Sequence, residues 1–256
     1  MTNDHSGSAR GVKSDETLVE ILAHLREVDG AGVTDIATHL GLAKSTVHDH
    51  LSTMVDHGFV VKRGSTYRLG LEFFGYGQYV RAGFDVYEAA KPVVDELADT
   101  TDEMVWLTVH QRGQIMYLYG HAGDTNVNEN ALLGSWTYMH CNSSGKAILA
   151  HLPREDVEYA IDRYGLPART ENTITDRDEL FAELERIRER GYALNLGEDL
   201  AGIHAVSVPL RYEERVRGAL AFAGPAHRVT RERCESELVE RLMASANDVE
   251  LNLAYR

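Results

Sequence analysis

The chain has 256 residues, 43% of them hydrophobic, so it can bury a core and form one large domain or two small ones. No apolar run approaches the roughly 20 residues that a membrane-spanning helix needs. The start of the chain, residues 1–12, lacks the apolar segment of a secretory signal and is expected to be a disordered lead. The two cysteines, Cys141 and Cys234, form neither a CxxC motif nor a disulfide framework, which favours the cytoplasm.

The formal net charge is -14, and it is unevenly distributed. Residues 1–70 hold 7 basic and 9 acidic side chains, residues 71–256 hold 19 and 31, and residues 40–70 alone hold 4 and 2. This acidity argues against nonspecific nucleic-acid binding but leaves room for a local contact surface. Only 5 of the 26 basic residues are Lys. Few lysines with many carboxylates are typical of proteins from halophilic organisms with acidic proteomes.

The first segment, residues 13–70, predicts three helices and a hairpin. Helical spacing of apolar residues runs from Ser14, the expected N-cap, to Val28, and Thr34 is expected to cap a second short helix. The third is predicted over about 44–57, with its inward face formed by Val47, Leu51, Met54 and Val55. Two β runs follow, joined by a Gly64-Ser65 turn. This order is a winged helix-turn-helix pattern.

In such a motif the second helix places its N-terminal residues at base edges in the major groove, and the hairpin contacts the DNA backbone. A polar face can also be merely solvated, and winged-helix modules also dock proteins. The basic hairpin beside the capped helices favours DNA. The candidate DNA-binding residues are Lys44, Ser45, Thr46, His48, Asp49, Lys62, Arg63 and Arg68.

The remainder predicts a linker helix over 71–84 and an α+β domain over 85–256. The linker, rich in Phe, Tyr and Gly, is expected to pack on a partner because its aromatic side chains have no other evident place. Beyond it, strands at "MVWLTVH", "IMYLYG", "YALN", "HAVSVPLR" and "RGALAFAG" alternate with helices at about 85–98, 144–152, 176–190 and 230–253. Short connections between strands predict a mainly antiparallel sheet.

Three segments resemble the IclR family of transcriptional regulators, over nearly the whole chain. They are "TDIATHLGLAKSTVHDHLSTMVDHGFV" with "YRLG", then "MHCNSSGKAILAHLP", then "RERGYALNLGEDLAGIHAVSVPLRYEERVRGALAFAGPAHR". The resemblance implies a GAF-like effector-binding domain and homodimers that pair into tetramers. Family members typically have Arg where this chain has Asp49 and Pro where it has Ala43. An acidic side chain there is unfavourable unless it accepts a hydrogen bond from cytosine. The resemblance therefore implies the groove-binding mode but not the family's usual operator sequence.

The segment "CNSSGKAIL" predicts a helix whose first amides bind a carboxylate, although Ser144 could be only an N-cap and Gly145 only a close-packing residue. At positions that contact ligand in the family, this chain has Asn195, Ala205, Ala221 and Ala223. The effector is therefore expected to be larger, less polar or held by other residues. Its expected class is a carboxylate of sugar or aromatic catabolism. The candidate effector-binding residues are Trp136, His140, Cys141, Asn142, Ser143, Ser144, Gly145, Asn195, His204, Ala205, Ala221 and Ala223.

Three alternatives stay open at this point. A metal- or redox-responsive regulator would need His110, His140, Cys141 and His204 to converge, although no pair has the spacing of a zinc motif. The C-terminal domain could serve oligomerisation alone. An enzyme is disfavoured because no nucleophile elbow or phosphate loop occurs. We expect no cofactor and no resident metal, with operator DNA, a small-molecule effector and a second copy of the chain as partners.

Overall fold

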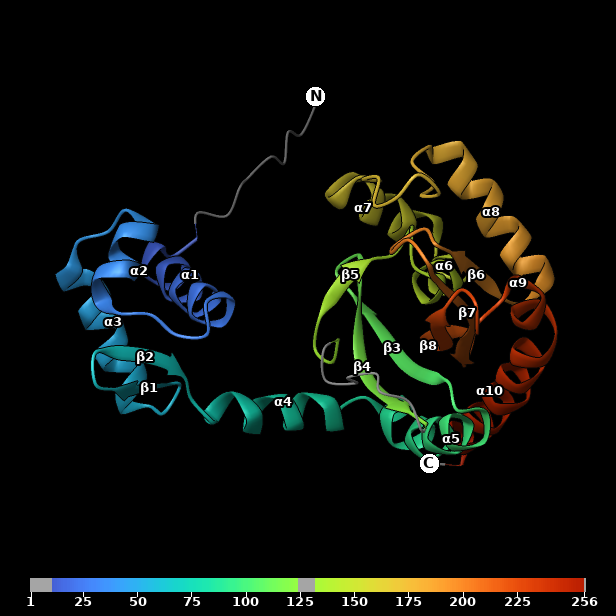
Figure 1. Ribbon diagram of the computed structural model, residues 1–256, viewed down its shortest axis with the longest axis horizontal. Coiled ribbons are helices and arrows are strands. Elements are labelled where there is room, and N and C mark those ends of the chain that lie inside the picture. Colours follow the sequence, from blue (N-terminus) through green and yellow to red (C-terminus); the bar gives the residue numbers. More distant parts are fainter. Residues whose placement is uncertain (1–10, 124–131, 256) are drawn as a thin grey trace, which may run out of the picture. The chain divides into compact units, whose positions relative to one another are not determined.

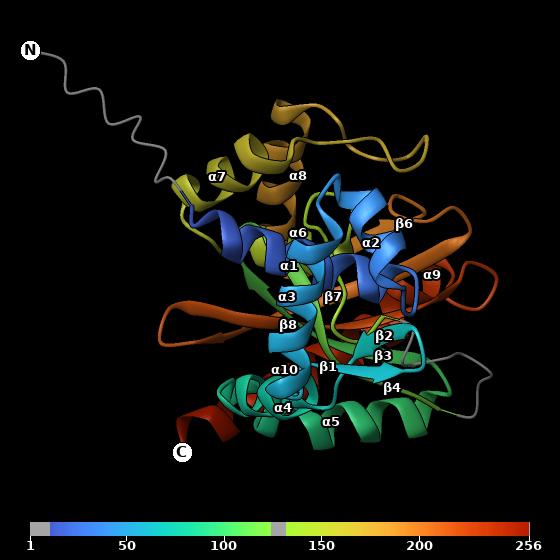
Figure 2. The same ribbon diagram turned by 90° about the vertical axis from the view of Figure 1, so that its left-hand side faces the viewer.

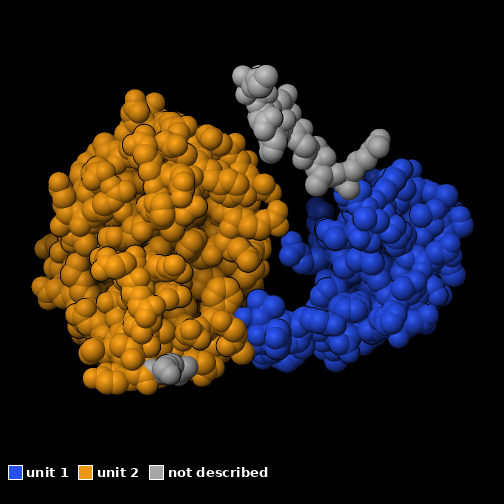
Figure 3. Space-filling view, turned by 180° about the vertical axis from the view of Figure 1, so that it is seen from behind, with its two compact units in different colours: residues 1–80 blue, residues 81–256 orange. Residues whose placement is uncertain are grey.

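The computed structural model describes residues 11–123 and 132–255, so most of the expected lead at 1–12 lies outside the described residues. The chain divides into two compact units, Met1–Val80 and Arg81–Arg256 (Figure 3). The division falls inside one helix, α4, which runs over Glu72–Ala82. Each unit has its own core.

The first unit is a helix-turn-helix with a hairpin wing, as its sequence predicts (Figures 1 and 2). Its elements are α1 (Lys13–Glu27), α2 (Val33–Leu40), α3 (Lys44–Asp56), β1 (Val60–Arg63) and β2 (Thr66–Leu69). The core joins the three helices to the wing, because Ile21, Ile36, Leu51 and Tyr67 pack in one buried cluster. An antiparallel bridge between Ala31 and Tyr67 fastens β2 to the loop before α2.

The helix starts differ slightly from those predicted. Ser14 is not an N-cap: Val12 holds that position, and Ser14 lies in the first turn of α1. Thr34 is not the N-cap of α2 either: Gly32 holds that position, and its N–H donates to the Asp35 carboxylate at 3.2 Å. That contact satisfies an amide at the helix start without a Ser or Thr cap.

Helix α4 has no buried residue. Tyr79 in this helix is 82% exposed, and Leu71, just before the helix, is 87% exposed. Only its first turns are held by the first unit, where Phe73 and Tyr76 contact the Phe59 ring at 5.2 and 5.5 Å between centroids. The predicted linker helix therefore exists, and an apolar surface along it is uncovered in the single chain.

The second unit is an α+β domain built on one antiparallel sheet of six strands, in the order β5-β4-β3-β8-β7-β6. Its elements, in chain order, are α5 (Asp85–Thr101), β3 (Met104–Gln111), β4 (Gln114–Ala122), β5 (Trp136–Tyr138), α6 (Ser143–Leu149), α7 (Arg154–Tyr164), α8 (Arg177–Arg190), β6 (Ala193–Leu196), β7 (Ile203–Tyr212), β8 (Arg215–Pro225), α9 (Arg231–Arg233) and α10 (Val239–Ala254). This arrangement confirms the predicted fold class.

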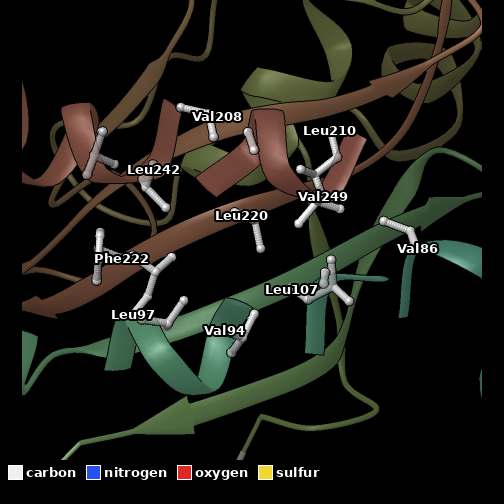
Figure 4. Packing of buried hydrophobic residues seen from close by; sticks show 14 of the residues in the cluster. Val86, Val94, Leu97, Leu107, Val208, Leu210, Leu220, Phe222, Leu242 and Val249 are labelled. Atoms are coloured by element: carbon white, nitrogen blue, oxygen red, sulfur yellow. The ribbon is translucent and has the colours of Figure 1, made fainter. Parts of the chain in front are cut away.

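Alternation along the strands creates two distinct faces. One face packs on α5 and α10, where Leu107, Leu220 and Phe222 from the sheet meet Val94 and Leu242 from the helices (Figure 4). The opposite face packs on α6, with α8 behind it. This second face contains most of the candidate effector-binding residues.

Three features of the second unit are absent from the sequence prediction. Strand β5 has only three residues and lies at the sheet edge, inside what the sequence presents as a loop. Helix α7 buries Val157 and Ala160, with Ile161 packed against the same cluster, and the sequence prediction does not include this helix. The last predicted helix is interrupted between α9 and α10 by a π-helical turn at Cys234–Leu238.

Candidate functional site

Helix α3 presents a polar face because its other face is anchored in the core. Val47, Leu51 and Met54 are buried. Each residue two positions earlier, namely Ser45, Asp49 and Ser52, is exposed on the opposite side, since two residues correspond to about 200° of rotation. The first turn has no side-chain cap, so its amides are available to an acceptor from outside the helix. Lys44, Thr46 and His48 are exposed along the same first turns.

The wing lies beside this face. A groove of about 640 Å³ is lined by the start of α2, including Thr34, by His48 of α3 and by Lys62 and Ser65 of the wing. The Lys62 ammonium lies 5.3 Å from the centroid of the Tyr67 ring, which holds it by a cation–π contact. Of the predicted DNA-binding residues, His48 and Lys62 thus line one concave surface, which also contains Asp35.

The two wing arginines, Arg63 and Arg68, differ in their ion pairing. Arg63 is exposed and ends strand β1. Arg68 instead forms an ion pair with Asp29 at 3.2 Å, after the end of α1. Its charge is therefore partly neutralised, which distinguishes it from the other predicted DNA contacts.

In the second unit, two cross-strand rows form the sheet face beneath α6. In the first row, Asn195, Ala205, Ala223 and Met104 follow one another across β6, β7, β8 and β3. In the second row, Ser207, Ala221 and Trp106 lie side by side. The three alanines therefore share one face with Trp106, as cross-strand partners must.

A cluster of hydroxyls joins this face to the start of α6. The Ser207 Oγ lies 2.7 Å from the Ser143 Oγ and 3.1 Å from the Ser144 Oγ. The Asn142 side chain donates to the Tyr117 hydroxyl at 2.9 Å and accepts from the Ser144 amide at 3.0 Å. All five residues are buried or nearly so. Burial raises the pKa of Tyr117 to about 12, so its hydroxyl stays protonated and can donate a hydrogen bond.

This geometry removes one of the three amides, that of Ser144, from the predicted anion site at the helix start. Asn142, not Ser144, is the N-cap, and its side chain already occupies the Ser144 amide. Helix α6 is only seven residues long, so its dipole is weak. The Asn195 side chain is also engaged, accepting from the Glu198 amide at 2.7 Å. The side-chain groups gathered at this face are therefore mainly hydroxyls.

An apolar cluster lies next to the hydroxyls. Met104, Trp106, Tyr117, Ala122 and Ala221 are buried together, with Leu133 and Ala223 packed against them. The Trp106 ring lies directly over Gly120, where a Cβ atom would come within 2.2 Å of it. The ring meets Tyr117 edge-on, at 4.9 Å between centroids. The Gly120 position thus creates the space in which Trp106 lies.

Several predicted effector residues do not reach this face. Trp136 pairs with Met116, which packs on the α5 side of the sheet, and it is 42% exposed. His204 is one residue from Ala205 and so points to the opposite side, where its Nδ1 lies 3.0 Å from the Val229 carbonyl oxygen. A one-residue step along a strand reverses the side-chain direction, so His204 and Ala205 point to opposite sides of the sheet.

His140 and Cys141 also have other partners. The His140 Nε2 lies 3.1 Å from the Pro167 carbonyl oxygen, and the Cys141 thiol faces Asp199 at 3.8 Å. Burial lowers the pKa of His140 and raises that of Cys141 to about 12. A thiol with so high a pKa is unreactive, because the thiolate is the nucleophile. Within residues 11–123 and 132–255, no three His, Cys, Asp or Glu side chains are placed to hold a metal, so the convergence required by the metal alternative is not found.

Beneath the hydroxyl cluster lies a buried ion pair. The Lys146 ammonium donates to both carboxylate oxygens of Glu198, at 2.6 and 2.5 Å, and Lys146 is only 1% exposed. Desolvation raises the pKa of Glu198, although the neighbouring ammonium opposes this. Gly145 is required alongside, since a Cβ atom there would lie 2.4 Å from the Met139 backbone. These contacts fix α6 against the loop after β6.

Sequence reasoning missed four residues of this face: Met104, Trp106, Tyr117 and Ser207. Ser207 carried a usable signal, because it is a lone hydroxyl within the apolar strand "HAVSVPLR". Met104 and Trp106 alternate with Val105 along β3, so the strand pattern placed them on one face. Only the cross-strand register shows which face it is.

A winged helix-turn-helix joined to an α+β domain with a compact polar and aromatic site defines a DNA-binding regulator with an effector domain. Residues 78–251 match the model of the bacterial transcriptional regulator IclR C-terminal domain, and residues 18–64 match the IclR helix-turn-helix domain. The chain belongs to the IclR family of transcriptional regulators, which are not enzymes.

Similarities to individual proteins agree with this family assignment. The chain is 29% identical, over 97% of both chains, to a probable HTH-type transcriptional regulator ArcR of Halobacterium salinarum. It resembles the crystal structure of the Thermotoga maritima IclR with a TM-score of 0.77 and 26% identity, over 95% of this chain and 98% of that one. An IclR homologue of Microbacterium hydrocarbonoxydans, crystallised with 4-hydroxybenzoate, shares the fold with a TM-score of 0.79 at 23% identity, over 93% and 100% of the chains. In the described part of the chain, no helix is long and apolar enough to cross a membrane.

Proposed function

We propose that this regulator binds its operator through the α3 face and the wing, and that its α+β unit senses a small acid with an apolar or aromatic body. The DNA-binding unit is proposed to comprise residues 13–70 and the effector unit residues 85–256, with the linker between them. The observation that carries the DNA part is the groove shared by His48 of α3 and Lys62 of the wing. A duplex can contact both at once, with α3 in the major groove.

The DNA contacts divide by chemistry. Lys44, Lys62 and Arg63 neutralise phosphates, and Arg68 contributes less because Asp29 holds it. Ser45, Thr46 and His48 donate to phosphate oxygens or base edges near the helix start. Together they fix α3 in register on the operator.

The double variant Lys44→Ala with Thr46→Ala tests this assignment. Both side chains are exposed, so thermal unfolding should stay unchanged while specific operator binding is lost. Footprinting on genomic fragments recovered with the wild-type chain measures the effect. A wild-type footprint from the double variant contradicts the assignment. Mapping bound DNA across the genome would identify the regulated genes.

The effector is proposed to place its polar end at Ser143, Ser144, Ser207 and Tyr117. Its apolar body would lie against Trp106 and the alanines at 205, 221 and 223. In this structure Leu133 packs on the same cluster, so a ligand entering there displaces Leu133. A hydroxyl-rich acid would leave polar groups unpaired against the alanines, at about 1–3 kcal/mol each, which favours a less polar ligand.

Isothermal titration with glyoxylate, longer aliphatic acids and 4-hydroxybenzoate tests the ligand class. We expect the aromatic or longer acids to bind more tightly than glyoxylate. The variant Ala221→Phe should fill the site and weaken larger acids most, whereas the exposed control Ala168→Phe should not. Preference for glyoxylate, or strict dependence on added zinc, contradicts the proposal. Absence of any saturable binding favours a domain that only oligomerises.

The chain is further proposed to form homodimers, and dimers of dimers, through α4. The support is the uncovered apolar surface of that helix, where Phe74 is 66% and Tyr79 82% exposed. Sedimentation of Tyr79→Glu should show a shift from dimer toward monomer. An unchanged sedimentation coefficient places the interface elsewhere.

We also infer a cytoplasmic protein adapted to high salt. The excess of 40 acidic over 26 basic side chains is mutually repulsive at low ionic strength. The similarity to a Halobacterium salinarum regulator agrees with this. Thermal unfolding should therefore shift upward between dilute buffer and molar KCl. A decrease in the unfolding temperature over that range contradicts the inference.

A further inference from the structure

We propose that Asp49 selects a cytosine at one fixed position of the operator, which makes an acidic side chain the main base-reading residue of α3. The inference rests on the proposed DNA-binding function and specifies which base the α3 face recognises. The Asp49 carboxylate lies at the centre of the helix surface that is proposed to enter the groove, where it would face the negatively charged DNA.

The position of Asp49 on the helix is central. Ser45, Asp49 and Ser52 form one stripe, and each lies two residues before a member of the buried stripe Val47, Leu51 and Met54. The Asp49 side chain is 84% exposed. It therefore projects away from the first unit's core, along the middle of the exposed face.

The residues around Asp49 leave its carboxylate available to accept a hydrogen bond from a base. Within the described residues, its ion-pair partner is the neighbouring His48 ring, at 3.8 Å, and no Lys or Arg pairs with it. The hydrogen bond from Thr53 goes to the Asp49 backbone carbonyl, not to its carboxylate. Asp35, by contrast, is engaged by the Gly32 amide. Asp49 thus has no structural role within this unit that explains its charge.

The hydrogen-bonding groups on the base edges then determine which base the Asp49 carboxylate can bind. An ionised carboxylate only accepts hydrogen bonds. In the major groove guanine and thymine present acceptors, adenine presents a donor beside an acceptor, and cytosine presents the N4 amino donor. Cytosine is the base that a carboxylate can approach without meeting an acceptor of the same base. Other bases leave the carboxylate desolvated, unpaired and close to phosphates.

Selection from a randomised duplex pool tests the proposal with the full-length wild-type chain and three variants. The wild type should enrich a motif with one cytosine whose replacement weakens binding by roughly ten- to a hundredfold. Asp49→Asn should shift that position toward adenine, because an amide pairs with the adenine N6 and N7. Asp49→Ala should lose the preference at that position and retain the rest of the motif.

The matched control is Asp56→Asn. Asp56 is an exposed acid at the far end of the same helix, away from the N-terminal residues that reach base edges. Its replacement should leave the motif unchanged and at most tighten binding to all sequences equally. Thermal unfolding of every variant should match the wild type, because both side chains are exposed.

Two failures are distinguishable. If Asp49→Ala tightens binding to every sequence equally and no position changes preference, Asp49 only repels the backbone and the inference is wrong, while the DNA-binding function stands. If the wild-type chain enriches no sequence at all, sequence-specific binding itself is contradicted, together with the role of Asp49.

Discussion

The two units use polar residues in opposite ways. In the first unit Lys44, Ser45, Thr46 and His48 lie on the surface, held in place only by the apolar side of α3. In the second unit Ser143, Ser144 and Ser207 are at most 1% exposed and are bonded to one another. The exposed polar groups are free to contact a large charged partner such as DNA. The buried hydroxyls already have hydrogen-bond partners, so a ligand could reach them only if the cluster opens.

This difference has an energetic consequence. Exposed polar groups contribute little to folding, so their replacement should affect binding and not stability. Buried polar groups are costly to leave unpaired, so their replacement should affect stability first. Matched variants at buried and exposed positions should therefore separate the two kinds of polar group.

Lys146→Ala should have the largest effect on stability. It leaves the Glu198 carboxylate, itself only 8% exposed, without its cation. Removing one partner of a buried pair costs about 3–5 kcal/mol. Urea unfolding of the full chain measures it. The control Arg231→Ala breaks the exposed pair with Glu235 and should cost only a few tenths of a kcal/mol. Equal costs for the two variants contradict the contrast between buried and exposed polar groups.

Gly120→Ala should come next. The added Cβ atom would lie 2.2 Å from Trp106, so the ring must move and the unfolding free energy should fall by about 1–3 kcal/mol. Tryptophan fluorescence should shift as the ring is displaced. The control is Gly75→Ala in α4, where no atom lies within 4 Å of the new Cβ. That change should be neutral or stabilise the helix by up to about 1 kcal/mol.

Acidification should weaken the second unit through its buried histidines. Burial lowers the pKa values of His140 and His151 below 6.5, so the unfolded chain takes up protons more readily than the folded one. Their contribution to stability is therefore present above pH 6.5 and is lost as the pH falls from there through the folded-state pKa values. Glu198 acts in the opposite direction, because its raised pKa makes the folded chain bind a proton more readily above pH 4.5.

His140→Gln isolates one contribution. The amide can still donate to the Pro167 carbonyl oxygen but does not titrate. The unfolding free energy of the wild type should fall relative to that of the variant as the pH is lowered from 7 to 5, because the unfolded chain binds a proton at this position more readily than the folded chain. A difference that is independent of pH shows that His140 is not kept neutral by burial.

The sequence predicted the structure of the first unit more accurately than that of the second, for a physical reason. The first unit is governed by local signals: helical periodicity, a hairpin turn at Gly64-Ser65 and a short chain between elements. Those signals predicted α3 to within one residue at its end. The Ser14 cap was wrong because caps depend on where the first turn settles, which is known only to within a residue or two.

In the second unit the important information is non-local. The predicted strands were found, but the sequence did not show on which face of the sheet Trp136 and His204 lie, because side chains alternate and the register was unknown. The Lys146–Glu198 pair joins positions 52 residues apart, so no spacing rule reveals it. Of the free amides expected at α6, that of Ser144 is already used by the Asn142 side chain, a competition that composition does not show.

The smallest expected effect concerns salt, and it separates cations within the first unit. A surface with about three effective phosphate contacts per chain implies a shallow dependence of log affinity on log salt, near -3. Lys62→Ala or Arg63→Ala should each reduce the magnitude of this slope by about 0.9. Arg68→Ala should reduce it by less, since Asp29 already pairs with the guanidinium at 3.2 Å. Asp29→Asn should then strengthen binding and steepen the slope, because it releases Arg68 to the backbone.

Arg231→Ala in the second unit serves as the control and should leave the slope unchanged, because that guanidinium pairs with Glu235 outside the proposed DNA face. Titrations of labelled operator at a series of KCl concentrations give each slope directly. A wild-type slope far steeper than about -3 would show that DNA also contacts cations outside α3 and the wing. Equal losses for Arg63→Ala and Arg68→Ala would show that the Asp29 pair opens on binding, so that the wing meets the DNA with both arginines.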